Sequence, residues 1–265
     1  GTLAVRGRFA GLSSALALAG RVVWAFAQRW RFPAALPERW TGLDWVWARG
    51  LWSVESLNTL WLAFASSVLG LALALSFVLA ERQARPSARA SIGWTGAAVL
   101  PLLIPQMTLI PALLLLDLTV LGLSPWALAL WGHVMFTAAY AYLSLRGAVM
   151  SLDPRYGKAA LALGRPPWQA LMLVELPVLL RPLMASVAIA LSVSVAAYLP
   201  TLTLGQGRLE TFTVEAVAAA TGGSRRTAAQ FALSQAFWAL LFFFAALAVP
   251  DLAHRNRRGL AAHVA

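Results

Sequence analysis

The sequence predicts an all-α, polytopic membrane protein, a bundle of about six transmembrane helices. Of its 265 residues, 60% are hydrophobic and only 12% are charged, and the mean hydropathy is +0.72. Soluble domains, in contrast, are about half apolar and about a quarter charged. In addition, several runs without any Asp, Glu, Lys or Arg are long enough to cross a hydrocarbon core, which needs about 20 apolar residues.

The predicted spans follow one another along the chain with short connections. Uncharged runs cover residues 56–80, 90–116, 118–145, 182–207 and 227–250. These runs and a further apolar stretch at the start of the chain place six spans near residues 9–28, 56–80, 92–118, 126–148, 177–200 and 228–250. The first span contains Arg21, which would have to reach the membrane surface or face a partner helix. An amphipathic helix lying at the interface is therefore the alternative for that segment.

The segment 29–55, between the first two spans, combines helix breakers with many tryptophans. Pro33 and Pro37 end any helix that reaches them. Tryptophan favours the headgroup level of a membrane, and this segment holds Trp30, Trp40, Trp45, Trp47 and Trp52. We therefore expect a loop and a short helix on the membrane surface. A patch that binds another protein is the alternative.

An even number of spans places both ends of the chain on the same side of the membrane. More of the 21 Lys and Arg residues fall in segments on the side of the termini, and cationic loops favour the cytoplasm. We therefore predict cytoplasmic termini, a cytoplasmic loop at residues 153–177, and an outer loop at residues 201–227 with a helix over 209–220.

No pattern in the sequence is typical of an enzyme or of a nucleic-acid-binding protein. The chain has no Cys, no Gly-rich phosphate-binding loop with a Lys, and no His-Glu-x-x-His motif. We therefore predict no catalytic residue, no metal site and no cofactor. The net charge of +11 is expected of loops that face anionic lipid headgroups, so we predict a lipid bilayer and no nucleic acid as partner.

Polar residues in or beside the spans are candidates for a path through the bundle, because a polar group in lipid is costly. Asp117 lies near the outer end of its predicted span, where a solvated interfacial carboxylate is the alternative. His133 lies deeper, where a neutral imidazole bonded to a neighbouring helix is the alternative. Gln106 lies between two prolines, where freed backbone groups would line protein or water. Tyr140 and Tyr198 complete the set.

The polar stretch 153–177 interrupts this apolar chain and predicts two short helices joined by a sharp turn. Asp153 can cap the first helix, and Gly164, followed by two prolines, ends it after about two turns. Ala159 and Ala160 together with Gly164 leave a surface poor in side chains, which another protein can approach closely. A loop that merely returns the chain to the membrane is the alternative.

The spacing in this stretch resembles that of a known family. The pattern Lys158-Ala159-Ala160-x3-Gly164-x9-Val174-x-Leu176-Pro177 is similar to the Glu-Ala-Ala…Gly…Ile-x-Leu-Pro loop in permease subunits of ATP-binding-cassette (ABC) importers. The run Asn58-Thr59-Leu60, the pair Arg181-Pro182 and the layout of residues 56–250 are also similar to that family.

Two further segments, 30–37 and 198–208, are most similar to the thiamine-type group of these permeases. Members of this group, like their iron(III) relatives, often carry two homologous halves in one chain. Because the sequence starts at Gly1 rather than Met, we expect it to be the second half of such a fusion.

The resemblance implies a type I importer permease in a bacterial inner membrane, whose cytoplasmic loop forms coupling helices. These helices would sit in a cleft of a separate ABC ATPase, which works as a dimer and hydrolyses the ATP, so this chain would not itself be an enzyme. A periplasmic solute-binding protein would deliver the solute, and a second permease half would complete the path. The implied divisions are a first span with a Trp-rich segment at 1–55, a core permease domain at 56–252 and a cytoplasmic tail at 253–265.

The residues that the resemblance assigns to the coupling loop are Asp153, Lys158, Ala159, Ala160, Gly164, Leu176 and Pro177. The family has Glu where this chain has Lys158, so any ion pair made there to the ATPase must be different or absent. An exposed pair contributes only about 0–1 kcal/mol, so we expect docking to depend on shape more than on charge.

The resemblance also implies a small solute, thiamine or a related cation, for which aromatic and acidic side chains would form a suitable lining. Asp117, Tyr140 and Tyr198 are the residues that would supply it. The alternative function is a polytopic membrane enzyme or scaffold without transport activity. A polar catalytic constellation in the spans would favour that alternative, and the sequence contains none.

Overall fold

The computed structural model describes residues 17–30, 34, 36–40, 42 and 53–254, and these residues are mainly helical, as predicted. The chain divides into two compact units. One comprises residues 1–60 and 207–238, and the other comprises residues 61–206 and 239–265. Two long helices, α3 (Val54–Ala84) and α12 (Arg225–His254), continue from one unit into the other. The division at residues 55 and 252 suggested by the sequence stays a prediction.

Three helices of the described residues are long and apolar enough to cross a membrane: Val54–Ala84, Pro125–Ser151 and Arg225–Ala253. They contain the spans predicted at 56–80, 126–148 and 228–250. Two bent helix pairs raise the number to as many as five, if each pair is counted as one span. The predicted span 92–118 lies in the first of these bent pairs, and residues 177–195 of the predicted span 177–200 lie in the second.

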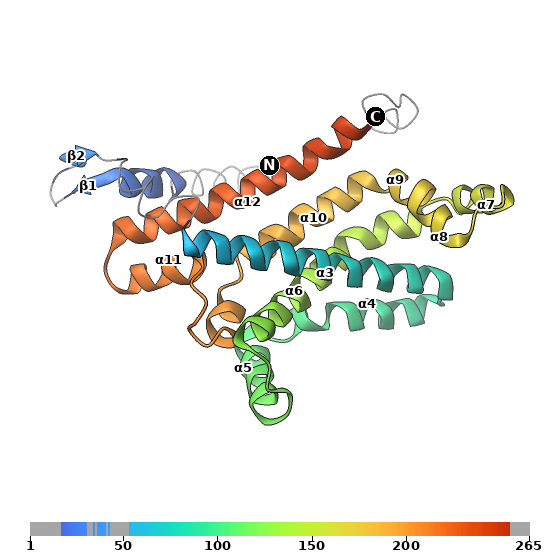
Figure 1. The fold of residues 1–265 in the computed structure, drawn as a ribbon, viewed down its shortest axis with the longest axis horizontal. Coiled ribbons are helices and arrows are strands. Elements are labelled where there is room, and N and C mark those ends of the chain that lie inside the picture. The colour runs from blue at the N-terminus through green and yellow to red at the C-terminus, as the bar shows by residue number, and fades with distance from the viewer. Residues whose placement is uncertain (1–16, 31–33, 35, 41, 43–52, 255–265) are drawn as a thin grey trace, which may run out of the picture. The chain divides into compact units, whose positions relative to one another are not determined.

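The span predicted at 92–118 is broken rather than continuous. Helix α4 (Ala88–Leu103) and helix α5 (Gln106–Leu116) are bent by 89° at a short break. Figure 1 shows α5 turning away from the direction of α4. Ile104 takes an extended conformation immediately before Pro105. Proline disfavours the helical conformation in the residue before it and has no N–H to continue the ladder, so the helix ends here.

The span predicted at 177–200 is also interrupted. Its regular part, α10 (Leu180–Val195), is bent by 79° from the helical segment Pro167–Val178. Pro182 explains the position of this bend, because its missing N–H removes the helical bond to the carbonyl of Val178. Beyond α10, a wider helical turn, η3 (Pro200–Leu204), continues the chain.

In the first unit, the described part of the span predicted at 9–28 is a short apolar helix, Ala17–Phe26, and residues 9–16 lie outside the described residues. The chain then forms a two-stranded antiparallel pair, β1 (Ala27–Arg29) with β2 (Arg39–Trp40), where we expected a loop. The predicted surface helix falls largely on residues 41 and 43–52, outside the described residues.

The outer-loop helix predicted over 209–220 is present as α11 (Phe212–Thr221). The Thr211 hydroxyl accepts the Val214 N–H at its start. Two residues of α3 hold the segment before it: the Asn58 amide donates to the Glu210 carbonyl at 2.9 Å, and the Thr59 hydroxyl accepts the Phe212 N–H at 3.1 Å. These bonds give Asn58 and Thr59 a structural role.

In the second unit, α6 (Pro125–Ser151) is the central helix and packs against α4 and α10. Its start is capped, because the Ser124 hydroxyl accepts the Ala127 N–H and Pro125 occupies the first turn. An apolar cluster from α3, α6 and the following segments lies at one end of the unit: Ala74, Val78, Ala141, Tyr142, Val149, Leu152 and Leu179.

Close packing between α3 and α6 depends on Gly70. A Cβ at this position would overlap the Thr137 hydroxyl and would lie 2.9 Å from the Ala138 backbone nitrogen. Such a contact forces a helix to shift, because backbone cannot rotate away as a side chain can. The small residues Ser66 and Ser67 on the same helix are also buried, which confirms that this stretch of α3 is a packing face.

Replacing Gly70 with Ala is therefore expected to destabilise the second unit by about 1–3 kcal/mol through overpacking. Gly96→Ala is the matched control, because a Cβ at Gly96 on α4 meets nothing within 4 Å. Thermal unfolding in detergent, followed by tryptophan fluorescence, measures both. Equal midpoints for the two variants would show that α3 and α6 are not this close.

Candidate functional site

The segment 153–177 forms two short helices with a sharp turn, as predicted. They are α7 (Arg155–Ala162) and α8 (Pro167–Ala170), followed by the wider turn η2 (Leu171–Glu175) and α9 (Leu176–Val178). Figure 1 shows α7 and α8 together at one end of α6 and α10. We call residues 153–177 the connecting loop.

An aspartate turn leads into the first helix of the connecting loop. The Asp153 carboxylate accepts the Arg155 N–H at 2.8 Å, which satisfies one of the backbone donors that a helix start leaves free. Pro154 stands between them in a helical conformation. Asp153 therefore forms an Asx turn just before α7, while Pro154 takes the N-cap position predicted for Asp153, and Asp153 is itself exposed.

Gly164 ends this helix in a left-handed conformation, with φ of +78°. The Arg165 N–H donates to the Ala160 carbonyl at 3.2 Å, and the Gly164 N–H donates to the Leu161 carbonyl at 3.0 Å. This pair of bonds is the Schellman motif, which satisfies the last carbonyls of a helix. A Cβ at Gly164 would meet nothing within 4 Å, so the requirement for glycine is conformational rather than steric.

The structure separates the residues predicted for docking. Lys158, Ala159 and Gly164 are exposed on the connecting loop. Ala160 is only 5% exposed, so it offers little surface of its own for docking, and its role there stays a prediction. It lies on the inner side of α7, because an amphipathic helix of two turns must turn some of its residues to the rest of the fold. Leu176 and Pro177 are half-buried, just before the 79° bend into α10.

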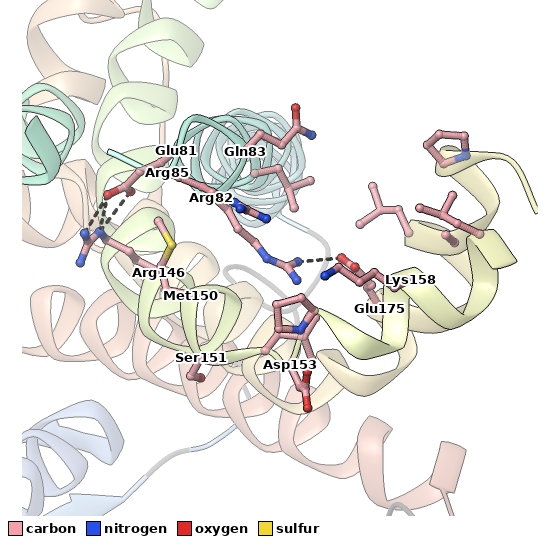
Figure 2. Close-up of a pocket in the computed structure, with 18 of the residues that line it drawn as sticks. Glu81, Arg82, Gln83, Arg85, Arg146, Met150, Ser151, Asp153, Lys158 and Glu175 are labelled. Atoms are coloured by element: carbon pink, nitrogen blue, oxygen red, sulfur yellow. Dashed lines mark hydrogen bonds and ion pairs between the residues drawn. The ribbon is translucent and has the colours of Figure 1, made fainter. Parts of the chain in front are cut away.

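An ion pair that we did not predict attaches the connecting loop to α3. The Arg82 Nη1 donates to the Glu175 Oε2 at 2.8 Å, and the two side chains are only 19% and 14% exposed (Figure 2). The other carboxylate oxygen of Glu175 lies against Gly157 of α7, where a Cβ would overlap it. Glu175 therefore contacts both α3 and α7. Its place in the pattern Val174-x-Leu176 gave no signal for this role.

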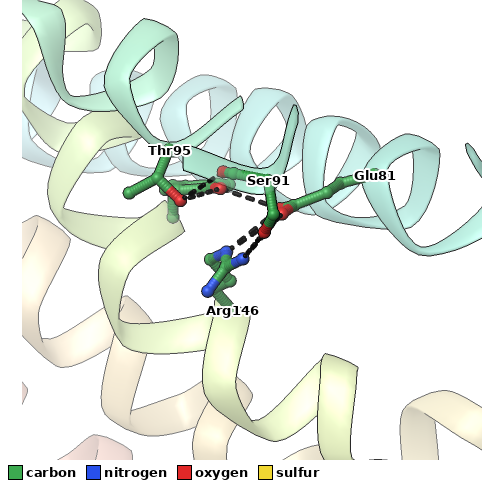
Figure 3. A network of polar contacts seen from close by, with 5 residues as sticks. Glu81, Ser91, Thr95 and Arg146 are labelled. Carbon is green, nitrogen blue, oxygen red and sulfur yellow. Dashed lines mark hydrogen bonds and ion pairs between the residues drawn. The ribbon is translucent and has the colours of Figure 1, made fainter. Parts of the chain in front are cut away.

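A second polar cluster, also not predicted, joins the ends of α3, α4 and α6 (Figure 3). Glu81 is fully buried, and the Arg146 guanidinium donates to both of its oxygens, with Nη2 2.7 Å from Oε1 and Nε 3.1 Å from Oε2. The Tyr142 hydroxyl donates to Oε2 at 2.8 Å, and the Ser91 hydroxyl donates to Oε1 at 3.1 Å. This two-point pairing, with two further donors, meets the demands of a buried carboxylate.

The Glu81 cluster and the Arg82–Glu175 pair line the same cleft, which has a volume of about 1160 Å³. Lys158 and Asp153 of the connecting loop also line it (Figure 2). The sequence held one signal for the cluster: Glu81 directly follows one uncharged run, and Arg146 directly follows another. Charged residues that border two spans at the same membrane surface can form an ion pair. The sequence alone did not indicate that these two residues do.

His133 lies at the centre of a buried chain of hydrogen bonds. The Thr201 hydroxyl donates to the Ala197 carbonyl at 2.6 Å and therefore accepts from the His133 Nε2–H at 2.9 Å. The other ring nitrogen, Nδ1, then accepts from the Ser194 hydroxyl at 2.7 Å. The Ser66 hydroxyl in turn donates to Ser194 at 2.9 Å. These partners assign a neutral imidazole, bonded to neighbouring segments, which agrees with the alternative interpretation of His133.

Asp117 is buried in the turn that ends α5. It begins η1 (Asp117–Leu121), and its carboxylate accepts the Leu123 N–H at 2.8 Å. Its own carbonyl accepts the Gly122 N–H at 2.9 Å, with Gly122 at φ of +61°. The carboxylate thus stabilises a turn. This hydrogen bond explains why an acidic residue lies near the end of a span, and the explanation requires no bound solute.

Asp117→Asn is expected to change stability by less than about 1 kcal/mol, since the amide oxygen still accepts the Leu123 N–H. Asp117→Ala removes the acceptor and is expected to cost about 1–3 kcal/mol, because the N–H is left without a partner. Thermal unfolding in detergent distinguishes the two. If Asp117→Asn lost as much stability as Asp117→Ala, the negative charge of Asp117 would itself contribute to stability.

The structure does not bring the predicted path residues together. Gln106 and Tyr140 are exposed, Tyr198 is half-buried, and Asp117 and His133 are buried in separate contacts. Among the described residues, no hydrogen bond or ion pair joins any two of these five. Their role in a path stays a prediction.

Three comparisons relate the chain to known proteins. Residues 56–254 match the family described as "Binding-protein-dependent transport system inner membrane component". Over 161 residues the chain is 33% identical to the "Inner membrane ABC transporter permease protein YnjC" of Escherichia coli (strain K12), which is 61% of this chain and 32% of that protein. The structure titled "Crystal structure of an amino acid ABC transporter with histidines" has a TM-score of 0.46 and 16% sequence identity, over 76% of this chain and 91% of the solved chain.

Proposed function

Since this chain belongs to the family of binding-protein-dependent transport system inner membrane components, we propose that it is the translocation subunit of an ABC importer. The observation that supports this function most directly is the connecting loop. It presents Lys158, Ala159 and Gly164 on a short helix and its turn, at one end of the bundle. Such a compact, exposed element is suited to fit into a cleft of a partner protein.

The proposed partner at this loop is the dimeric ABC ATPase, which would hydrolyse ATP while this chain forms the path. Lys158, Ala159 and Gly164 would contact the ATPase, and Ala160 would support α7 from inside. Leu176 and Pro177 would pass the movement of the loop across the bend into α10. The proposal further includes a bacterial inner membrane, a second permease half and a periplasmic solute-binding protein, with the connecting loop and both termini in the cytoplasm.

The cargo within this proposal is thiamine or a related small cation, on the sequence similarity of segments 30–37 and 198–208 to thiamine-type permeases. The lining proposed from Asp117, Tyr140 and Tyr198 would require these residues to meet in another conformation, since Asp117 is occupied in its turn. Uptake measured with a panel of cationic and neutral solutes, together with the cognate binding protein, tests the cargo.

Co-purification and transport test the proposed function itself. We expect an affinity-tagged chain, extracted from its native membrane, to carry a nucleotide-binding subunit with it. We also expect the reconstituted complex to take up solute in an ATP-dependent manner. A chain that purifies without any ATPase, and whose vesicles show no ATP-driven uptake of any solute in the panel, would favour a membrane enzyme or scaffold instead.

A further inference from the structure

The Arg82–Glu175 pair differs from the other ion pairs of the described residues in what it connects. The Arg155–Asp153 pair lies within the connecting loop, with its atoms 3.9 Å apart and both side chains more than half exposed. The Arg82–Glu175 pair joins residues 93 positions apart and lies largely out of solvent. Among the described residues, it is the one ion pair between the connecting loop and a helix outside it.

Glu175 is held from two sides. One carboxylate oxygen accepts from Arg82, at the last turn of α3. The other lies so close to Gly157 that any side chain there would displace it. Gly157 is itself buried on the inner face of α7. The carboxylate therefore lies between Arg82 of α3 and Gly157 of α7, on the wall of the cleft.

An ion pair that is shielded from water is screened less than an exposed one, and its planar guanidinium restricts the geometry. Moving α7 relative to α3 would pull Glu175 away from Arg82 or push Gly157 onto the carboxylate. Both displacements are unfavourable. The contacts thus oppose independent movement of α7 and α3.

From these contacts we propose that Glu175 is a positioning residue, which fixes α7 to the end of α3 so that the two move together. The inference rests on the proposed function, since the movement would come from the ATPase that contacts α7. Without the pair, α7 would follow the ATPase while α3 stayed behind. ATP would then be hydrolysed with less solute moved.

Spin labels measure the positioning directly. The chain has no Cys, so within it only two introduced cysteines take the label, and the complex labelled without them gives the background of its partner. Suitable sites are Leu73→Cys on α3 and Leu163→Cys on the connecting loop, which are 55% and 83% exposed. In the full chain with its co-purified ATPase, we expect one narrow distance distribution, both without nucleotide and with ATP and vanadate. Glu175→Gln and Arg82→Gln are each expected to broaden it.

The exchanged pair, Arg82→Glu with Glu175→Arg, is the rescue variant and is expected to restore the narrow distribution. Gly157→Ala should broaden the distribution as Glu175→Gln does. Its matched control is Gly147→Ala on α6, where a Cβ meets nothing within 4 Å. A distribution in Glu175→Gln as narrow as in the unmodified pair would overturn the proposal.

Transport provides the second readout. In Glu175→Gln we expect the solute moved per ATP hydrolysed to fall at least about fivefold, the lower end of typical coupling between sites, while ATP hydrolysis continues. The exchanged pair should restore the ratio, which a general loss of folding would not allow. An unchanged ratio in Glu175→Gln overturns the coupling role. Vesicles of the unmodified complex that show no ATP-driven uptake contradict the proposed function instead, and the spin-label distances still decide whether Glu175 positions α7.

Discussion

Replacing Arg146 with Met is expected to lower the free energy of unfolding by about 3–5 kcal/mol, the largest effect that we foresee for a single change. Glu81 is fully buried, and Arg146 supplies its only cationic partner among the described residues. Without the guanidinium, a buried carboxylate keeps only two hydroxyl donors. An uncompensated charge in this position must either be protonated or draw water into the bundle.

Thermal and denaturant unfolding in detergent measure this loss. The matched control is Arg181→Met, since Arg181 pairs with Asp251 at 3.0 Å but both side chains are largely exposed, at 40% and 70%. That change is expected to cost less than about 1 kcal/mol. The double variant Glu81→Leu with Arg146→Met should recover most of the stability, because it removes the buried charge altogether. Equal effects of the two arginine changes would contradict a buried network at Glu81.

Replacing Gly164 with Val is expected to uncouple ATP hydrolysis from transport while the protein still inserts into the membrane. Gly164 has φ of +78°, and a residue with a Cβ costs about 1–2 kcal/mol in the left-handed conformation, more when it is β-branched. The strain acts on the turn after α7 alone, since a Cβ there meets no other atom within 4 Å. The connecting loop would refold locally, and the presentation of Lys158 and Ala159 would change.

Gly164→Asn is the control, because asparagine tolerates the left-handed conformation better than other residues. We expect it to keep most of the coupling, whereas Val reduces the solute moved per ATP at least about tenfold, within the usual range of coupling. The ratio is measured in proteoliposomes that contain the complete complex. A Val variant that couples as well as the Asn variant would show that this turn does not determine docking.

Several features of the fold follow from local sequence and were predictable. Uncharged runs bounded by charges located three long helices, because desolvation in lipid acts on every residue of a span. The Ser124-Pro125 start of α6 and the Gly164 end of α7 were predictable because caps involve residues a few positions apart. The prolines indicated where the spans could bend, but not by how much, because a proline-containing apolar run has the same hydropathy whether it is straight or broken. The direction in which such a run bends depends on the helices that pack around it.

The polar contacts of the site were not predictable in the same way. Glu81 and Arg146 are 65 residues apart, and Arg82 and Glu175 are 93 apart, so their pairing depends on the packing of whole helices. The burial of Ala160 depends on which side of α7 faces the rest of the fold, and the motif spacing alone does not contain that information. The hydrogen bonds of His133 likewise require three segments, and only an alternative interpretation anticipated them.

The Glu81 cluster also has a consequence for membrane topology. Ser91 in the first turn of α4 and Arg146 near the last turn of α6 both contact Glu81 in the last turns of α3. The end of α6 is therefore close to the end of α3, where α4 begins. The end of α6 lies beside the end of α3 regardless of the route that α4 and α5 take through the 89° bend at Ile104. The α3–α4 connection and the connecting loop must then face the same aqueous compartment, whichever compartment it is.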